Sequence, residues 1–238
     1  MNDNLEYFEN IDKAIEYFSS ATREELFSFL KNENDEVLQQ IALLKINEVT
    51  SVNEAQEITT LLTEHSSETR EYCSFLINRL MKKEEFRQYF SGNIILNKFT
   101  HSISDVNPKV CRKIIEILPY YTQKEDLFNF VLKNTFILIE ELREKNKNKN
   151  YQYNTKSFHL YWHIFALGYI LTDHLFCNNK KDLLKLLDLL FLFNEYTIRE
   201  KGAYLIKQIA PFITQNELNL LLNQYSNDEN FYVKEIFN

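Results

Sequence analysis

The stretch Pro119–Glu125, which reads PYYTQKE, decides the fold because it returns later in the chain. The second copy, Pro211–Glu217, reads PFITQNE, so that proline, an aromatic or apolar pair, Thr-Gln and a final Glu recur at the same spacing. The copies start about 92 residues apart, which suits two structural units of roughly 46 residues each. Each copy follows a segment with the apolar spacing of a helix. The repetition predicts a stacked array of helix–turn–helix units rather than an enzyme domain built around one deep pocket.

Helix starts can be recognised from a second pattern, a Ser or Thr followed three residues later by Glu. This pattern occurs at Thr22/Glu25, Ser51/Glu54, Thr122/Glu125 and Thr214/Glu217. In such a capping box the hydroxyl accepts a hydrogen bond from the amide three residues on, and the Glu side chain accepts one from the first amide. Because each pair precedes an apolar run, the sequence predicts four helix N-termini at these positions.

A second class of helix alternates with the first and opens with a polar cluster, then a β-branched residue and often a base. Apolar residues then follow at three- and four-residue steps, as expected for a helix with one buried face. The predicted core positions are Val37, Ile41 and Leu44; Tyr72, Cys73, Leu76 and Leu80; Val110, Ile114 and Ile117; and Ile198, Leu205 and Ile209. These positions predict a continuous core shared by neighbouring helix pairs.

This alternation resembles HEAT repeats, which are antiparallel helix pairs whose second helix opens with a polar residue, then Val, then Arg. The bases at this position are Arg70, Arg112, Arg199 and Lys234. The resemblance implies an all-α fold, an α-solenoid of about five to six stacked antiparallel helix pairs forming a single domain over residues 1–238. The repeated bases have two readings: they pair with acids of the neighbouring unit, or they line one face of the stack.

Composition limits the partners that the chain can take. The chain has 238 residues, and 27 Lys and Arg against 34 Asp and Glu give a net charge of −7. This acidic balance argues against nucleic acid as a partner, because sequence-independent binding needs many Lys and Arg contacts to phosphate. The N-terminus is polar and acidic, and no apolar run is long enough to span a bilayer. We therefore expect a cytoplasmic protein with no membrane contact.

One segment breaks the helical pattern and is rich in Lys and Asn. It runs from about residue 144 to 156 and carries Tyr151 and Tyr153 among its cations. Proteins that bind single-stranded nucleic acid also combine cations with aromatic rings. The low apolar content predicts a solvated loop between two helices.

The residues with reactive side chains do not form a recognisable catalytic or metal site. Cys73, Cys111 and Cys177 stand apart within helical patterns, which predicts buried free thiols. His159 and His163 share a helix face at a spacing that permits metal binding, but no Glu stands between them as in zinc metalloproteases. We expect ordinary helix histidines, no catalytic residues, no metal and no cofactor.

An aromatic stripe, Tyr161, Trp162, Phe165 and Tyr169, follows helical spacing. It is typical either of a core or of a stacking surface for a peptide or a base. The second helix of each pair is expected to line the inner face of the solenoid. The candidate binding residues on that face are Arg112, Glu116, Tyr161, Trp162, Arg199 and Tyr204.

Three functions remain open at this point. The HEAT resemblance implies a non-enzymatic protein–protein interaction module, a scaffold, adaptor or regulator that binds another protein or a peptide. A second hypothesis is an AlkD-like HEAT-repeat DNA glycosylase or DNA-binding protein that uses Tyr161, Trp162 and Asp173 near the base and Arg112 or Arg199 on phosphate. A third is a HEAT-repeat lyase or chaperone acting on a partner protein, which the sequence does not separate from a scaffold.

Overall fold

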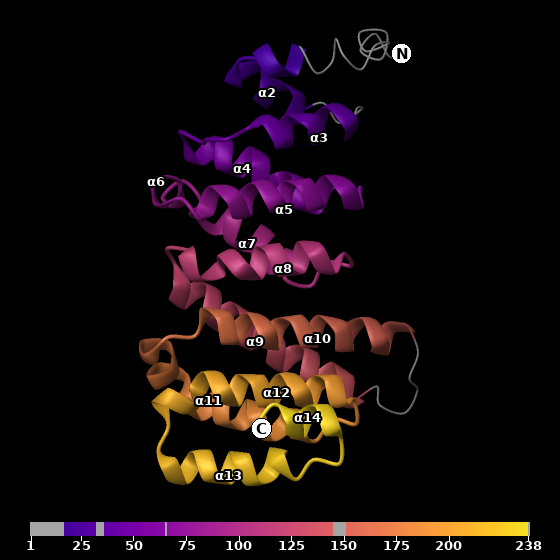
Figure 1. Cartoon of the computed structure of the whole chain (residues 1–238), viewed down its shortest axis with the longest axis vertical. Coiled ribbons are helices and arrows are strands. Elements are labelled where there is room, and N and C mark those ends of the chain that lie inside the picture. The colour runs from indigo at the N-terminus through magenta and orange to yellow at the C-terminus, as the bar shows by residue number, and fades with distance from the viewer. Residues whose placement is uncertain (1–16, 32–35, 65, 145–150, 238) are drawn as a thin grey trace. The chain divides into compact units, whose positions relative to one another are not determined.

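Helices account for all the regular structure in the described part of the chain. The computed structural model describes residues 17–31, 36–64, 66–144 and 151–237, and every regular element among them is an α- or 3₁₀-helix (Figure 1). The chain divides into two compact units. Unit 1 comprises Met1–Ser102 with Tyr120–Thr122, and unit 2 comprises Ile103–Pro119 with Gln123–Asn238.

Unit 1 consists of consecutive helix pairs. Its helices are α2 (Arg23–Leu30), α3 (Glu36–Lys45), α4 (Val52–Thr60), α5 (Ser67–Met81), the short α6 (Glu84–Arg87) and α7 (Asn93–Ser102). Helix α2 packs on α3, and α4 packs on α5. Helices α2, α4 and α7 also pack on one another in chain order, as do α3 and α5. The unit therefore has two rows of helices, the first members of the pairs in one and the second members in the other.

The predicted helix starts in unit 1 are confirmed. The Thr22 hydroxyl accepts from the Glu25 amide at 3.3 Å, and the Thr22 amide donates to the Glu25 carboxylate at 2.7 Å, which completes a capping box. Ser51 accepts from the Glu54 amide at 3.3 Å, but the Glu54 carboxylate accepts from Thr50 at 2.8 Å instead. Both hydroxyls satisfy an amide that has no partner within its own helix.

The predicted core face of α3 is wrong by one residue. Val37 is 62% exposed and Leu44 is 47% exposed, while Leu38, Ala42 and Leu43 are buried. Tyr72 on α5, also assigned to the core, is partly exposed, whereas Cys73, Leu76 and Leu80 beside it are buried as predicted. Helix α3 is apolar on two faces, and the packing of its neighbours decides which one is buried. On the buried face, the amide of Gln39 donates to the last carbonyl of α2, that of Leu30, at 3.1 Å.

Unit 2 has the same construction with longer helices. They are α8 (Pro108–Ile117), α9 (Lys124–Glu144), α10 (Tyr151–Ile170), α11 (Asp173–Phe191), α12 (Tyr196–Ile209), α13 (Gln215–Ser226) and α14 (Phe231–Glu235). The pairs are α9 with α10, α11 with α12, and α13 with α14, and the second helices α8, α10, α12 and α14 pack on one another in chain order. The predicted core positions on α8 and α12, including Val110, Ile114, Ile198 and Leu205, are buried.

Both copies of the repeated stretch form the same turn. Pro119 lies in a 3₁₀ turn (Leu118–Tyr120) that follows α8, and Pro211 lies in another (Ala210–Phe212) that follows α12. The next helix starts a few residues later, and in the second copy Thr214 and Glu217 complete a capping box. In the first copy α9 begins at Lys124, so the residue before it is Gln123 and the predicted cap at Thr122 lies one position too early.

The described residues form the predicted all-α solenoid. Five consecutive pairs of described helices lie inside the two units, α7 closes unit 1 and α8 opens unit 2. This agrees with about five to six helix pairs. No helix among the described residues combines the length and apolar character needed to cross a bilayer.

The loop predicted at residues 144–156 is wrong over its second half. Residues 145–150 lie outside the described part of the chain, but Tyr151–Lys156 form the first turns of α10. Lys156 pairs with Glu141 on α9, and Tyr153 is buried. Burial raises the pKa of Tyr153 to about 12, and a hydrogen bond to Glu195 acts in the same direction. Although this segment is polar overall, the buried ring of Tyr153 and the ion pair between Lys156 and Glu141 stabilise the start of α10.

Two of the three predicted buried thiols are confirmed. Cys73 and Cys111 are buried, and their thiols donate to the carbonyls of Ile58 at 3.0 Å and Asp105 at 3.1 Å. Cys177 is exposed, which corrects the prediction. It follows the buried Leu175 and Phe176 on α11 and so faces outward.

Candidate functional site

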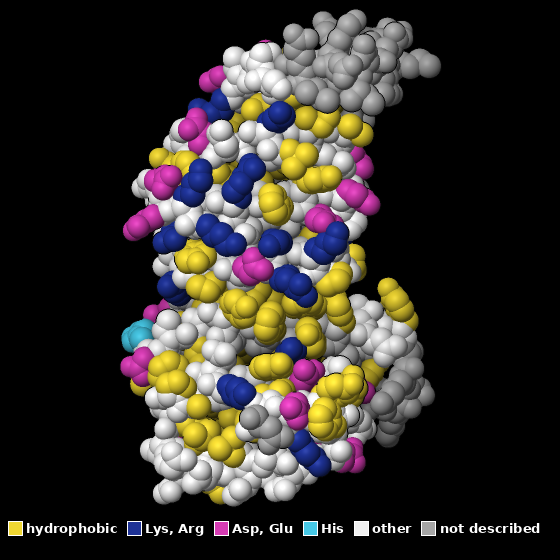
Figure 2. Space-filling model, in the orientation of Figure 1, with side chains coloured by type: hydrophobic (Ala, Val, Ile, Leu, Met, Phe, Trp, Pro, Cys, Tyr) yellow, Lys and Arg dark blue, Asp and Glu magenta, His cyan; other side chains and the backbone are white. Residues whose placement is uncertain are grey.

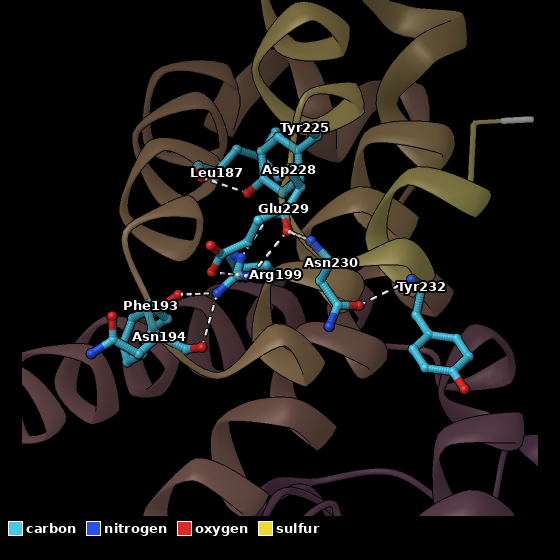
Figure 3. A network of polar contacts seen from close by, with 9 residues as sticks. All are labelled: Leu187, Phe193, Asn194, Arg199, Tyr225, Asp228, Glu229, Asn230 and Tyr232. Atoms are coloured by element: carbon cyan, nitrogen blue, oxygen red, sulfur yellow. Dashed lines mark hydrogen bonds and ion pairs between the residues drawn. The ribbon is translucent and has the colours of Figure 1, made fainter.

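Arg199 is a structural residue and does not lie on the binding surface assigned to it. It is buried, and its Nε and one Nη donate to the two carboxylate oxygens of Asp228 at 2.6 and 3.0 Å (Figure 3). The other Nη donates to the carbonyls of Phe193 at 2.6 Å and Asn194 at 2.9 Å. Of the two readings for the repeated bases, pairing within the stack holds for Arg199.

This network fixes the turn between α13 and α14 to α12. Burial acts to raise the pKa of Asp228, but hydrogen bonds from Arg199 and from the Asn230 amide, together with the Arg199 charge, hold that pKa below its ordinary value. Nearby, the buried Tyr225 hydroxyl donates to the Leu187 carbonyl of α11 at 2.7 Å. Arg70 plays a related part in unit 1, where it donates to the Glu64 carbonyl at 2.8 Å. The repeated base thus serves in two units as a clamp on the preceding turn.

The candidates on α8 remain near the surface. Arg112 is exposed, and Glu116 is half-buried and forms an ion pair with Lys113 at 3.3 Å. Neither residue lines the cavity between α10 and α12.

The aromatic stripe on α10 is both core and surface. Its rings meet edge to face, with centroids 5.2 Å apart for Tyr161 and Trp162, 5.9 Å for Trp162 and Phe165, and 5.0 Å for Phe165 and Tyr169. Trp162 is only 6% exposed, whereas Tyr161 and Phe165 are half-buried and Tyr169 is exposed. Figure 2 shows hydrophobic side chains gathered on the face that carries α10. The core role is therefore confirmed for Trp162, while a stacking role for the exposed part of the stripe stays a prediction.

Three aromatic rings surround a lysine of α12. The Lys201 ammonium lies 4.8 Å from the ring centroid of Tyr161, 5.2 Å from that of Phe165 and 4.4 Å from that of Tyr204. Each distance is within the range of a cation–π interaction. Lys201 is 8% exposed. No carboxylate in the described part of the chain forms an ion pair with it.

A cavity of about 340 Å³ opens beside this lysine, between α10 and α12; we name it the α10–α12 groove. Its size is within the range of small-ligand and side-chain pockets. The groove is lined by Ile164, Phe165, Gly168, Tyr169, Leu171, Lys201, Tyr204, Leu205 and Gln208. All of these residues belong to unit 2, and the walls come from two helices that pack directly on each other.

The structure brings together only some of the predicted site residues. Tyr161 and Tyr204 meet at Lys201, and Trp162 supports Tyr161 and Phe165 from within the core. Sequence reasoning missed Lys201, Gly168 and Gln208. A signal for Lys201 was present, because it stands three residues after Ile198 and four before Leu205, at a position in the apolar pattern where a hydrophobic residue is expected.

His163 lies on the same helix and is buried. Its Nδ1 lies 2.9 Å from the His159 carbonyl, which can only accept, so Nδ1 carries the proton. Burial lowers the pKa of His163 to about 4, although the hydrogen bond to His159 acts in the opposite direction. No group of three or more potential metal ligands occurs in the described ranges.

The low pKa of His163 predicts loss of stability in acid. Between its ordinary pKa of 6.5 and about 4 the unfolded chain binds a proton that the folded chain does not, so stability falls as pH falls through this window. Between about pH 7 and about pH 4.5, His163→Leu should lose about 2 kcal/mol less stability than the wild type, measured by urea unfolding. The control His174→Leu removes an exposed histidine of α11 and leaves His163 in place, so it should keep the loss of stability that His163 causes in acid. Equal pH dependence in all three proteins would contradict this assignment.

Comparisons with known proteins show similarity of fold only. No family model matches the sequence, and no curated protein matches it. Among solved structures, the chain is similar to an engineered protein at 12% identity over 90% of this chain and 92% of that one, with a TM-score of 0.48. A designed armadillo repeat protein is similar at 12% identity over 89% and 94%, with a TM-score of 0.48. A second engineered protein gives 15% identity over 90% and 94%, with a TM-score of 0.47.

Proposed function

We propose that this protein is a protein-interaction module that binds a peptide segment of a partner protein in the α10–α12 groove. The observation that carries the proposal is a cavity of about 340 Å³ walled by aromatic and aliphatic side chains, with Lys201 held at one side by three rings. A groove of this kind can accept side chains of a partner and exclude water from them.

The rim of the groove supplies the side chains that most often dominate protein interfaces. Tyr169 is 45% exposed and Tyr204 is 42% exposed, so each has apolar ring surface to bury against a partner. Tyr contributes a large contact area, pays little conformational entropy and retains a hydroxyl for a hydrogen bond. Both residues project from packed helices, which limits the ordering that binding must impose.

The DNA glycosylase alternative gains no support from this geometry. It would use Trp162 as a stacking surface, but this ring is only 6% exposed and packs among Phe158, Tyr161 and Phe165.

Peptide selection followed by substitution tests the proposal. Peptides selected from a random display library on the full chain should bind the Tyr204→Ala variant at least about tenfold more weakly, because one aromatic anchor at an interface contributes about 1.4 kcal/mol or more. Tyr72→Ala is the matched control, because Tyr72 is 37% exposed and lies in unit 1. Trp162 is the only tryptophan and contacts Phe165 in the groove wall, so its fluorescence reports occupancy. Selected peptides that bind all three proteins equally would contradict the proposal.

A methyl group added to the groove floor should separate binding from stability. A Cβ on Gly168 would meet Gln208 Cγ at 3.4 Å and Leu205 Cδ1 at 4.0 Å, both ordinary contacts. Gly168→Ala should therefore raise the free energy of unfolding by up to about 1 kcal/mol, since alanine favours the helix. The same methyl group reduces the cavity, so selected peptides should bind more weakly. Thermal melting and peptide titration measure the two effects, and unchanged affinity would place the peptide elsewhere.

A further inference from the structure

We infer that the α10–α12 groove recognises an acidic side chain, Asp or Glu, whose carboxylate pairs with Lys201 while an adjacent apolar side chain of the same peptide enters the cavity. This inference rests on the proposed function and specifies the chemistry of the peptide.

The charge of the groove is the first argument. Among the residues that the structure describes, Lys201 is the only charged one that lines the groove. Two other cations of unit 2 that join helices have carboxylate partners, since Lys180 pairs with Glu217 at 2.8 Å and Arg199 with Asp228. Lys201 has three ring faces instead. Rings attract the charge, but the ammonium keeps three N–H donors that a carboxylate satisfies better. The site is thus complementary to an anion.

The source of the carboxylate follows from the backbone of the walls. Proteins that capture a C-terminal carboxylate use unpaired backbone N–H groups. The groove is walled by the interior and last turns of α10 and by the interior of α12, where backbone amides donate within their own helix. Side chains alone therefore face the ligand, and a single ammonium suits a single side-chain carboxylate. We accordingly assign the acid to Asp or Glu within the peptide.

The neighbouring apolar residue follows from the remaining lining. Ile164, Phe165, Leu171 and Leu205 give the cavity an aliphatic and aromatic wall next to the lysine. Burying an apolar side chain there removes its own surface, and the exposed parts of Phe165 and Leu171, from water, which is favourable in proportion to the area covered. A pair such as Glu-Leu places the charge on Lys201 and the apolar group in the cavity.

Pools of short peptides, acetylated and amidated at their ends, test the inference directly. The pools are identical except for one central residue, Glu, Gln or Lys, which precedes a fixed Leu. Titration monitored by Trp162 fluorescence should show that the wild type binds the Glu pool at least about tenfold more tightly than the Gln pool. Lys201→Glu should reverse the order in favour of the Lys pool, and Lys201→Met should bind the Glu and Gln pools alike.

The control is Lys207→Glu, which makes the same change in net charge at an exposed position on the same helix. Lys207→Glu should keep the preference of the wild type for the Glu pool over the Gln pool. If the overall electrostatic field of the protein set this preference, Lys207→Glu would change it as well. Thermal melting establishes that each variant is folded, and Lys201→Met decides the question if Lys201→Glu does not fold.

Failure of the inference and failure of the proposed function are distinguishable. If the wild type binds the Glu and Gln pools equally, or if Lys201→Met keeps the preference for Glu, the inference is overturned. Selected peptides that depend on Tyr204 would then still support the proposed function. Binding that needs a free C-terminus, independently of the central residue, also overturns the inference. If neither the pools nor any selected peptide depends on the groove residues, both proposals are overturned.

Discussion

Replacing Arg199 with methionine should lower the free energy of unfolding by about 3–5 kcal/mol, the cost typical of leaving a buried charge without its partner. The Asp228 side chain is 1% exposed and would keep its negative charge without the guanidinium that accompanies it. The carbonyls of Phe193 and Asn194 would also lose their donor. Unfolding in urea, followed by circular dichroism, measures the change.

The repeat itself offers a matched control. Arg112 has the corresponding position on α8 but is exposed, so Arg112→Met should change stability by no more than about 0.5 kcal/mol. The stability loss of Arg199→Lys should lie between those of Arg112→Met and Arg199→Met. Lysine keeps the positive charge but lacks the planar group that donates to both carboxylate oxygens. Similar losses for Arg112→Met and Arg199→Met would show that the clamp contributes little.

The pH dependence of this effect has a definite sign. The folded-state pKa of Asp228 lies below its ordinary value of 3.8, so its contribution to stability is present above that pH and is lost as pH falls through the folded-state pKa. In Arg199→Met the carboxylate can be protonated and lose its charge in acid. The stability gap between wild type and variant should therefore narrow toward about pH 3 and stay constant near neutrality.

Gly202→Ala should lower the free energy of unfolding by about 3 kcal/mol, from overpacking and from a lost buried hydrogen bond. A Cβ on Gly202 would lie 2.5 Å from the Tyr225 hydroxyl oxygen and 3.0 Å from a ring carbon. Tyr225 is fully buried, and its hydroxyl donates to the Leu187 carbonyl, so the ring cannot move without losing that bond. The helix-forming advantage of alanine, about 1 kcal/mol, is too small to offset this.

Two variants separate this clash from a general effect of alanine. Gly168→Ala places the same substitution in a helix where the new methyl has room, and it should stabilise. Tyr225→Phe removes the oxygen that the new methyl group at position 202 would meet. The double variant Gly202→Ala/Tyr225→Phe should therefore lose less free energy of unfolding than the sum of the two single losses. Strict additivity of the two substitutions would contradict the proposed collision.

The fold was predictable where the signals are local. The capping boxes at Thr22 and Thr214 depend on side chains three residues apart, and the structure contains both. The core face of α3 was not predictable in this way, because Val37 and Leu38 are both apolar and the choice depends on how α2 and α5 pack against them. The first turns of α10 were missed for a similar reason, since the ion pair of Lys156 with Glu141 joins residues on two helices.

The candidate site was predictable only in part. Tyr161 and Tyr204 belong to the predicted surface, and the structure brings them to one lysine. Arg199 was misplaced because a base at a repeated position can face either way, and its acid, Asp228, lies 29 residues further on. Lys201 was missed because lysine is normally a surface residue, although its place in the apolar pattern between Ile198 and Leu205 was a signal. The separation between interacting residues, more than their chemistry, limited the prediction.

The clamp between Arg199 and Asp228 ties the turn between α13 and α14 to the segment of α12 that walls the groove. Arg199 and Lys201 lie two residues apart on α12, so the acid that holds one also fixes the helical segment that presents the other. Under the proposed peptide binding, substitutions at residues 228–230 would alter ligand preference without any contact to the ligand. Two sets of residues would then determine the choice of peptide: those that line the groove, and the clamp of Arg199 and Asp228 behind it.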